Sequence, residues 1–210
     1  MTTSGKFIER TFQTRTALHA EAKAMLRGEI GGLDGERILL LSGGATPMPI
    51  YDAIAHNPVP LKDGLYVLLT DERHVPEDAP ESNFGHIRPM FQAIGLPDAQ
   101  AMRIQPELPL EEAAARYAAA LDALFARIPA IHLGIFGVGP DGHTCSLFSM
   151  EDLDTPPDLP AKATLRPTPP HRITVTVATM ARVERAVVWL TSPAKRDIAR
   201  KLLETPEDIV

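Results

Sequence analysis

The sequence has little cysteine, no long apolar run and no concentration of basic residues. Cys145 is the only cysteine among 210 residues, which excludes an internal disulfide and a zinc site built from several thiolates. A single free thiol fits a reducing compartment, and the first residues lack the apolar core of a secretory signal. We therefore expect a cytoplasmic protein.

Two further absences narrow the partners. No apolar segment approaches the roughly 18 residues that a membrane-spanning helix needs, so we expect no membrane association. The formal net charge is −6 and no dense block of Lys and Arg occurs, which argues against nucleic acid. An anionic ligand would therefore have to be bound by a local group of basic side chains. The length favours one domain, residues 1–210, as a monomer or a homodimer.

What the sequence does contain is an alternation of apolar strands and amphipathic helices. Three short apolar runs are typical of buried parallel strands: residues 37–42, 65–70 and 131–136. Four helices are expected: residues 11–29 and 110–127 from their helical spacing, 47–55 after a glycine turn, and 83–91 after a cap. Three more strands are expected at residues 102–105, 172–177 and 186–191. Residues 150–170, crowded with Pro and Asp, are expected as a loop or flexible excursion, and Pro193 as the start of a final helix. The pattern predicts an α/β domain with a parallel sheet.

The first strand ends in a glycine turn that is suited to bind an anion. Ser42, Gly43, Gly44 and Thr46 precede a helix with Pro47 in its first turn. Backbone N–H groups at a helix N-terminus, with two hydroxyls, would point at one phosphate. An ordinary strand–helix turn is an equally open interpretation of this stretch alone.

Residues 131–148 combine a strand with three glycines, an acid and a histidine. Asp141 is a natural cap for a helix that begins at Gly142 or His143. The positive end of that helix would keep the His143 imidazole neutral, and a neutral imidazole can take a proton from water. We expect His143 to be a general base; the alternative is one more polar residue at a helix start.

Two other chemistries are disfavoured. The glycines of residues 137–142 have the spacing of a dinucleotide fingerprint, but that fingerprint belongs to a first strand–helix unit, and this one lies past the middle of the chain. Asp71, Glu72 and His74 follow the second strand, but neighbours on an extended chain point in opposite directions and no second cluster completes a metal site. We expect neither an organic cofactor nor a metal.

Four motifs in this order resemble the 6-phosphogluconolactonase family: SGGATP at residues 42–47, TDERHVP at 70–76 with ESN at 81–83, GVGPDGHTCSLF at 137–148, and PHRITVT at 170–176. The resemblance runs from the first strand to the last helix. It implies the fold of the sugar-phosphate isomerase and CoA-transferase-like group, a modified Rossmann-like parallel sheet with helices on both faces. It also implies hydrolysis of 6-phospho-D-glucono-1,5-lactone to 6-phosphogluconate, in the oxidative branch of the pentose phosphate pathway.

The resemblance implies roles for individual residues. His143 would activate water for attack on the lactone carbonyl, Asp141 would orient the loop or the imidazole, and Asp71 would position the substrate. A backbone N–H of the glycine-rich segment would stabilise the oxyanion, and Gly139 is expected among the substrate-binding residues. Three cations match basic positions of the family and would bind the phosphate: Arg73, Arg172 and Lys195. Arg172 is expected to matter most, because a planar guanidinium can bind two phosphate oxygens.

Two alternatives stay open. Glucosamine-6-phosphate isomerases share the glycine turn and the Asp-Gly-His, but they typically have tyrosine where this chain has Arg73 and glutamate where it has Phe148. A non-catalytic sugar-phosphate sensor would not need both Asp141 and His143. Cys145 is expected to be a buried small hydrophobe and not a nucleophile, because residues i and i+2 diverge on a helix.

Overall fold

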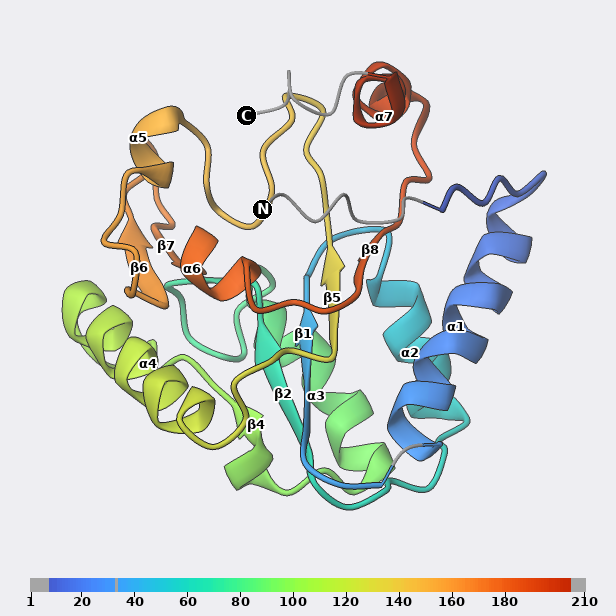
Figure 1. Ribbon diagram of the computed structural model, residues 1–210, viewed down its shortest axis with the longest axis horizontal. Coiled ribbons are helices and arrows are strands. Elements are labelled where there is room, and N and C mark those ends of the chain that lie inside the picture. Colours follow the sequence, from blue (N-terminus) through green and yellow to red (C-terminus); the bar gives the residue numbers. More distant parts are fainter. Residues whose placement is uncertain (1–7, 33, 205–210) are drawn as a thin grey trace.

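The computed structural model describes residues 8–32 and 34–204 (Figure 1). A five-stranded parallel sheet lies at its centre, with the strand order β4-β2-β1-β5-β8. The strands are Arg37–Leu41 (β1), Leu65–Leu69 (β2), Ala101–Met102 (β4), Leu133–Phe136 (β5) and Ala186–Val188 (β8). The predicted parallel sheet is confirmed. The strand predicted at residues 102–105 is shorter and starts earlier, because only Ala101 and Met102 pair with β2.

β1 is the central strand, and all five of its residues are buried. It pairs along its whole length with β2, from Arg37 opposite Leu65 to Leu41 opposite Leu69, and with β5 on its other side. Successive side chains of a strand point to opposite faces, so Leu39 and Leu41 enter one apolar cluster and Ile38 and Leu40 enter another. The sheet therefore has a hydrophobic core on each face.

Three helices cover the first face, and Figure 1 shows them on one side of the sheet. They are α1 (Arg15–Gly31), α2 (Met48–His56) and α3 (Asn83–Ile94). The Thr14 hydroxyl accepts the N–H of Ala17 to cap α1, and the Ser82 hydroxyl accepts the N–H of Gly85 to cap α3. The helices predicted to start at residues 11 and 83 therefore begin within a few residues of the observed starts of α1 and α3.

The second face is covered by α4 (Leu110–Phe125) and by a separate antiparallel sheet of three strands, in the order β3-β7-β6. These strands are Asp71–Arg73 (β3), Ala161–Thr164 (β6) and Arg172–Val175 (β7). The residues 150–170 expected as a loop thus contain β6 and a one-turn helix, α5 (Met150–Leu153). Ile173 and Val175 of β7 share an apolar cluster with Tyr117 and Leu121 of α4, which completes the core on this side.

The chain after β8 returns above the carboxyl edge of the parallel sheet (Figure 1). A short 3-10 helix, Pro193–Lys195, precedes α7 (Arg196–Glu204). The final helix predicted from Pro193 therefore begins with a tighter turn that carries Lys195 at its end. In the described part of the chain, none of the helices is long and apolar enough to cross a membrane.

Candidate active site

Three neighbouring strands bring the predicted motifs to one edge of the sheet. β1 leads into residues 42–46 (the 42–46 turn), β2 leads into Asp71, and β5 leads into residues 137–149 (the glycine loop). The strand order β2-β1-β5 makes these segments neighbours. Ligands of open α/β sheets bind at the carboxyl edge, so the arrangement is that of a site.

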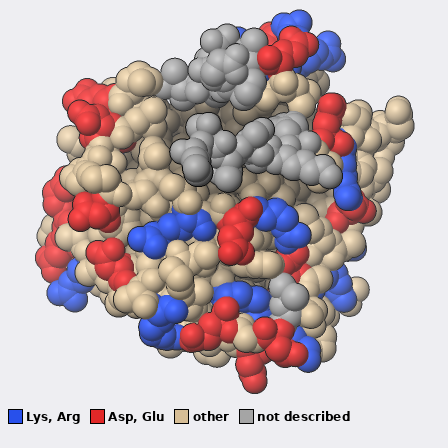
Figure 2. Space-filling model, in the orientation of Figure 1, with Lys and Arg blue, Asp and Glu red and all other residues tan. Residues whose placement is uncertain are grey.

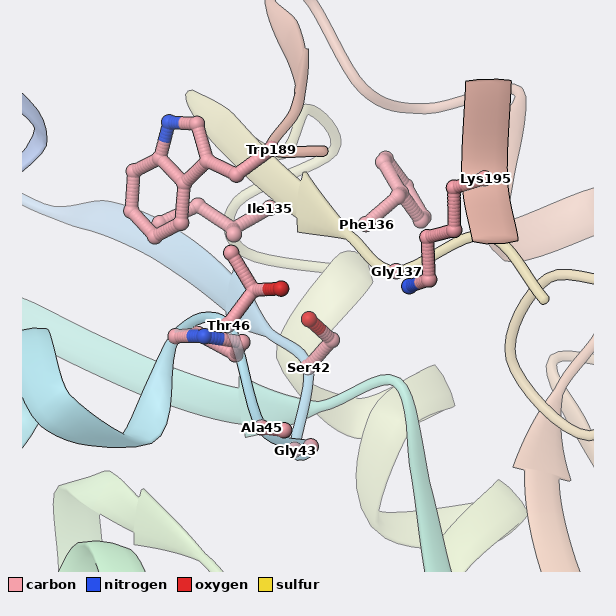
Figure 3. A pocket seen from close by; sticks show the side chains of 11 residues that line it. Ser42, Gly43, Ala45, Thr46, Ile135, Phe136, Gly137, Trp189 and Lys195 are labelled. Carbon is pink, nitrogen blue, oxygen red and sulfur yellow. The ribbon is translucent and has the colours of Figure 1, made fainter. Parts of the chain in front are cut away.

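The 42–46 turn forms one wall of a pocket (Figure 3). Phe136 and Gly137 at the end of β5, Trp189 after β8, and Lys195 contribute the other walls. Gly44 has a φ of +105°, a left-handed conformation that favours glycine. The cavity measures about 40 Å³, and a cavity of about 10–15 Å³ already holds one water molecule. It therefore has room for a small anionic group.

Three polar groups point toward the same space in this pocket: the hydroxyls of Ser42 and Thr46 and the ammonium of Lys195 (Figure 3). The buried Ser42 hydroxyl has no hydrogen-bond partner within the described residues, and the Thr46 hydroxyl lies 3.0 Å from that of Thr191. Burial lowers the pKa of Lys195. An unpartnered buried hydroxyl and a partly desolvated ammonium would both be stabilised by an anion.

Residues outside the turn hold it in place. A side chain at Gly43 would collide with the Asn83 amide, so this position requires glycine. Asn83 in turn donates from Nδ2 to the carbonyl oxygen of Asp71 at 3.0 Å, and the Tyr51 hydroxyl donates to the carbonyl oxygen of Ser42 at 3.0 Å. The turn, the end of β2 and the start of α3 are thus packed as one unit.

Glu72 is the buried residue that fixes the start of α3. Its carboxylate accepts the backbone N–H groups of Arg73 at 2.6 Å, Asn83 at 2.8 Å and Phe84 at 2.6 Å, and the Ser82 hydroxyl at 3.2 Å. Burial raises the pKa of Glu72, although the three N–H groups oppose the rise. From the sequence we considered Glu72 only as a metal ligand. The TDERHVP motif, which contains Glu72, occurs together with the ESN motif at residues 81–83, and this pairing was the signal for a contact between them.

The glycine loop is a closed turn, and the helix predicted to begin at Gly142 or His143 does not form. Val138 pairs with Thr144 in an antiparallel bridge, and the N–H of Gly139 donates to the carbonyl oxygen of His143 at 2.8 Å. The N–H of Gly139 is therefore already engaged and is not free for an oxyanion. The argument that a helix N-terminus keeps His143 neutral is wrong, because the backbone closes on itself instead.

The carboxylate of Asp141, and not a helix N-terminus, determines the orientation and tautomer of the His143 imidazole. Asp141 Oδ1 lies 2.6 Å from His143 Nδ1. A carboxylate only accepts, so Nδ1 carries the proton and Nε2 keeps a lone pair in the neutral ring. Burial raises the pKa of the Asp141 carboxyl, but the hydrogen bond and charge of His143 outweigh it and leave that pKa below its usual value. A side chain at Gly139 would collide with both partners, so glycine there makes room for the pair.

Asp71 ties the glycine loop to the end of β2. Its Oδ1 accepts the Thr70 hydroxyl at 2.9 Å, and its Oδ2 accepts the Ser146 hydroxyl at 2.7 Å. The Ser146 backbone N–H donates to the Thr174 hydroxyl at 3.1 Å, so β7 also supports the loop. Sequence reasoning did not find Ser146, because its partners lie 28 and 75 residues away along the chain.

Cys145 occupies an unusual backbone conformation, with a φ of +55°. It lies in the closed turn, so the helical-spacing argument against a role as nucleophile does not apply. The structure supplies another. Burial raises the pKa of the Cys145 thiol, and the charge of Asp71 adds to the rise, so the reactive thiolate is disfavoured. The side chain packs against the apolar cluster on the α4 face.

The three predicted cations fall into two groups. Lys195 lines the pocket with the 42–46 turn, whereas Arg73 and Arg172, which face each other across the β3–β7 ladder, are not among the described residues that line it. Burial lowers the pKa of Arg172, and the charge of Arg73 lowers it further, while Asp71 opposes the change. Like charges directly opposite in a ladder are destabilising, so an anion near this pair would offset their repulsion.

The surrounding surface supplies no broad field of one sign on the face that Figure 2 shows, where acidic and basic side chains are interspersed. Capture of an anion there depends on the local cations. Among residues 8–32 and 34–204, no three His, Cys, Asp or Glu side chains gather as a metal site would require.

A family model described as glucosamine-6-phosphate isomerases/6-phosphogluconolactonase matches residues 13–209. A 6-phosphogluconolactonase from Homo sapiens is 38% identical over 144 residues, which make up 66% of this chain and 55% of the relative. The chain spans about half the length of the human protein.

Solved structures agree on the fold. The crystal structure of a 6-phosphogluconolactonase from Thermotoga maritima matches with a TM-score of 0.73 at 25% identity, over 91% of this chain and 85% of that one. A monomeric glucosamine-6-phosphate deaminase also gives a TM-score of 0.73, at 21% identity, over 92% and 86% of the two chains. The fold is therefore common to both activities. Because the family model matches nearly the whole sequence, the chain belongs to the family of glucosamine-6-phosphate isomerases and 6-phosphogluconolactonases.

Proposed function

We propose that this chain is a 6-phosphogluconolactonase, which hydrolyses 6-phospho-D-glucono-1,5-lactone to 6-phosphogluconate. The observation that carries the proposal is the hydrogen-bonded Asp141–His143 pair in the glycine loop, which follows β5, the strand next to β1 and its 42–46 turn. The imidazole of this pair can activate water, and the 42–46 turn can hold a phosphate. The names of the human and Thermotoga relatives support the same activity.

In the proposed mechanism, His143 Nε2 takes a proton from water while the water oxygen attacks the lactone carbonyl carbon. The carbon becomes tetrahedral, and its bond to the ring oxygen then breaks. The imidazolium returns the proton to that leaving oxygen. Asp141, at 2.6 Å from Nδ1, stabilises the imidazolium between these two steps. No metal or organic cofactor takes part in the proposed steps.

The phosphate is assigned to the 42–46 turn and Lys195. The unpartnered Ser42 hydroxyl, the Lys195 ammonium and the pocket size support this assignment. Arg73 and Arg172 are proposed as additional anion ligands beside Asp71, where their facing charges favour a negative group. Asp71 holds the loop through Ser146, and we propose that it also accepts a hydrogen bond from a sugar hydroxyl. The reaction is placed in the cytoplasm, with a monomer or a homodimer as the working unit.

The deaminase alternative has the same fold but lacks support at one position. Glucosamine-6-phosphate isomerases typically have glutamate where this chain has Phe148. Here the Phe148 ring contacts the His143 ring, with 4.6 Å between the ring centroids. An apolar ring cannot shuttle the protons that ring opening of an amino sugar requires. We therefore expect no turnover of glucosamine 6-phosphate.

The test compares His143→Ala with wild type on freshly made phosphorylated lactone, after subtraction of spontaneous hydrolysis. Loss of the general base should lower kcat by roughly 10²- to 10⁴-fold. A matched control is His86→Ala, since His86 is exposed and its Nε2 hydrogen-bonds the Pro80 carbonyl oxygen. An unchanged kcat in folded His143→Ala would reject the mechanism, and turnover of glucosamine 6-phosphate by wild type would favour the alternative.

A further inference from the structure

An aromatic ring and a cation lie behind the imidazole of His143. The Phe148 ring is tilted by 50° against the His143 ring, with 4.6 Å between centroids. The Arg166 guanidinium carbon lies 3.7 Å from the centroid of the Phe148 ring, well within the range of a cation–π contact. The three side chains form a continuous stack, His143–Phe148–Arg166.

The stack joins two segments that no sheet connects. Phe148 belongs to the glycine loop, and Arg166 lies between β6 and β7, where its backbone N–H donates to His171 Nδ1 at 3.2 Å. Arg166 forms no ion pair within the described part of the chain. Its guanidinium is thus occupied by the ring and not by a carboxylate. The charge of Arg166 also contributes to the lowered pKa of Arg172, so Arg166 lies on the side of the proposed anion ligands.

A second support for His143 has a physical reason. The Asp141 side chain is 65% exposed, and water and salt weaken the interaction of an exposed carboxylate with the imidazolium that forms during the reaction. A single hydrogen bond at Nδ1 also leaves the imidazole free to rock about the N–O line. A ring packed against the imidazole restricts that motion, because aromatic pairs prefer tilted or offset contacts. Arg166 in turn restricts Phe148.

We infer that Phe148 and Arg166 are positioning residues, which aim Nε2 of His143 at the water and act on the reaction only through the imidazole. The inference rests on the proposed function, since it concerns the aim of the general base. It gives Phe148 a role in the lactonase reaction itself. In the comparison with the isomerases, Phe148 mattered only because it is not a glutamate. Misplacement of a catalytic group by an ångström is enough to slow a reaction greatly.

The test uses kcat and KM for the phosphorylated lactone. Phe148→Leu should lower kcat by roughly 3- to 10-fold, the loss expected for one aromatic contact, with KM little changed. Phe148→Tyr keeps the ring and should restore kcat. Arg166→Gln should lower kcat less than Phe148→Leu. The double variant should be no slower than Phe148→Leu alone, because both residues act through the same ring.

A matched control is Arg182→Gln, since Arg182 lies over the ring of Phe125, with 4.7 Å to the centroid, and the Arg182 carbonyl accepts the N–H of Ile131 ahead of β5. Its kcat should equal that of wild type. A raised KM with unchanged kcat in Arg166→Gln, additive with Phe148→Leu, would show that Arg166 binds the phosphate and would overturn the inference. An unchanged kcat in folded Phe148→Leu would also overturn it.

The outcomes separate the inference from the function on which it rests. If His143→Ala loses activity and Phe148→Leu does not, only the stack is rejected. If His143→Ala keeps activity, the proposed mechanism itself has failed. The proton resonances of the His143 ring give a readout that does not need turnover: the ring-current shift from Phe148 should disappear in Phe148→Leu and persist in Phe148→Tyr.

Discussion

The Lys195 ammonium and the Ser42 hydroxyl are both turned into the pocket (Figure 3). For a buried polar group, the absence of a partner is energetically unfavourable. Such a group is retained where a ligand completes it. The pocket therefore indicates a binding function even though its volume is small.

The half-buried position of Lys195 predicts a pH dependence of phosphate binding. Because burial lowers the pKa of Lys195 below its ordinary value, the charge that we propose to bind phosphate is present at low pH and is lost as pH rises through that pKa. We expect the Kd of 6-phosphogluconate, measured by calorimetry, to increase toward alkaline pH, and to do so at a lower pH than an exposed lysine would give.

The matched variant for this prediction is Lys195→Arg, whose guanidinium does not titrate in the range. Its Kd should stay flat over the same pH interval. If wild type and Lys195→Arg show the same pH profile, another group titrates and Lys195 does not hold the phosphate.

The sequence predicted residues that act through local motifs better than residues that act through contacts. The 42–46 turn, Asp141 and His143 could be proposed from the sequence because each lies within a few residues of the feature that suggests its role. Phe148 and Arg166 contact each other across 18 positions of the chain, and no periodicity marks such a pair. The reason given for His143 failed because an Asp-Gly pair after proline suits a helix start and a closed turn equally.

At the scale of elements, α3 begins in an unusual way. The first N–H groups of a helix lack partners within the helix, and here the carboxylate of Glu72 on β3 accepts those of Asn83 and Phe84. Ser82, the cap residue, donates its own hydroxyl to Glu72 and accepts the N–H of Gly85. A strand residue and a cap residue thus share the start of one helix.

Glu72→Ala should be strongly destabilising. Each buried donor left without an acceptor costs about 1–3 kcal/mol, and two helix N–H groups would be left so. Glu72→Gln keeps a carbonyl oxygen of the same reach and should be less destabilising. Urea unfolding of both variants measures the difference; equal losses would mean that packing and not hydrogen bonding explains the effect.

The second sheet shows why some elements escaped prediction. β3 reads Asp-Glu-Arg, with no apolar residue, and β6 reads Ala-Lys-Ala-Thr, whose apolar positions are only alanines; alanine is depleted in strands, which are rich in β-branched and aromatic residues. Both form because they pair with β7, whose Ile173 and Val175 are buried. The parallel strands, by contrast, were predicted because burial on both faces requires continuous apolar runs.

On the scale of the whole molecule, the parallel sheet has a second edge that is equally well organised. Arg37 begins β1 at the amino edge and is only 5% exposed. Its guanidinium donates to five backbone carbonyl oxygens, those of Glu29, Ile30, Gly35, Lys62 and Asp63. Burial lowers the pKa of Arg37. One side chain thus joins the end of α1 to the segments that precede β1 and β2.

Arg37→Lys should separate stability from activity. An ammonium cannot reach five carbonyl oxygens, and hydrogen bonds to a charged group contribute about 1.5–3 kcal/mol each, so the free energy of unfolding should fall by at least that amount. The proposed catalytic residues lie at the opposite edge, so kcat of the folded variant should match wild type. A lowered kcat without loss of stability would contradict this division.

The closed glycine loop has a consequence for how such a protein can change. Gly139, Asp141 and His143 lie within five consecutive residues, and the loop's own hydrogen bonds hold them together. Asp141 and His143 thus belong to one short continuous segment, whereas the 42–46 turn, Lys195, Arg73 and Arg172 are spread over the rest of the chain. Substitutions among the dispersed residues should therefore change the proposed affinity for a phosphorylated lactone without disturbing the pair that we propose to transfer the proton.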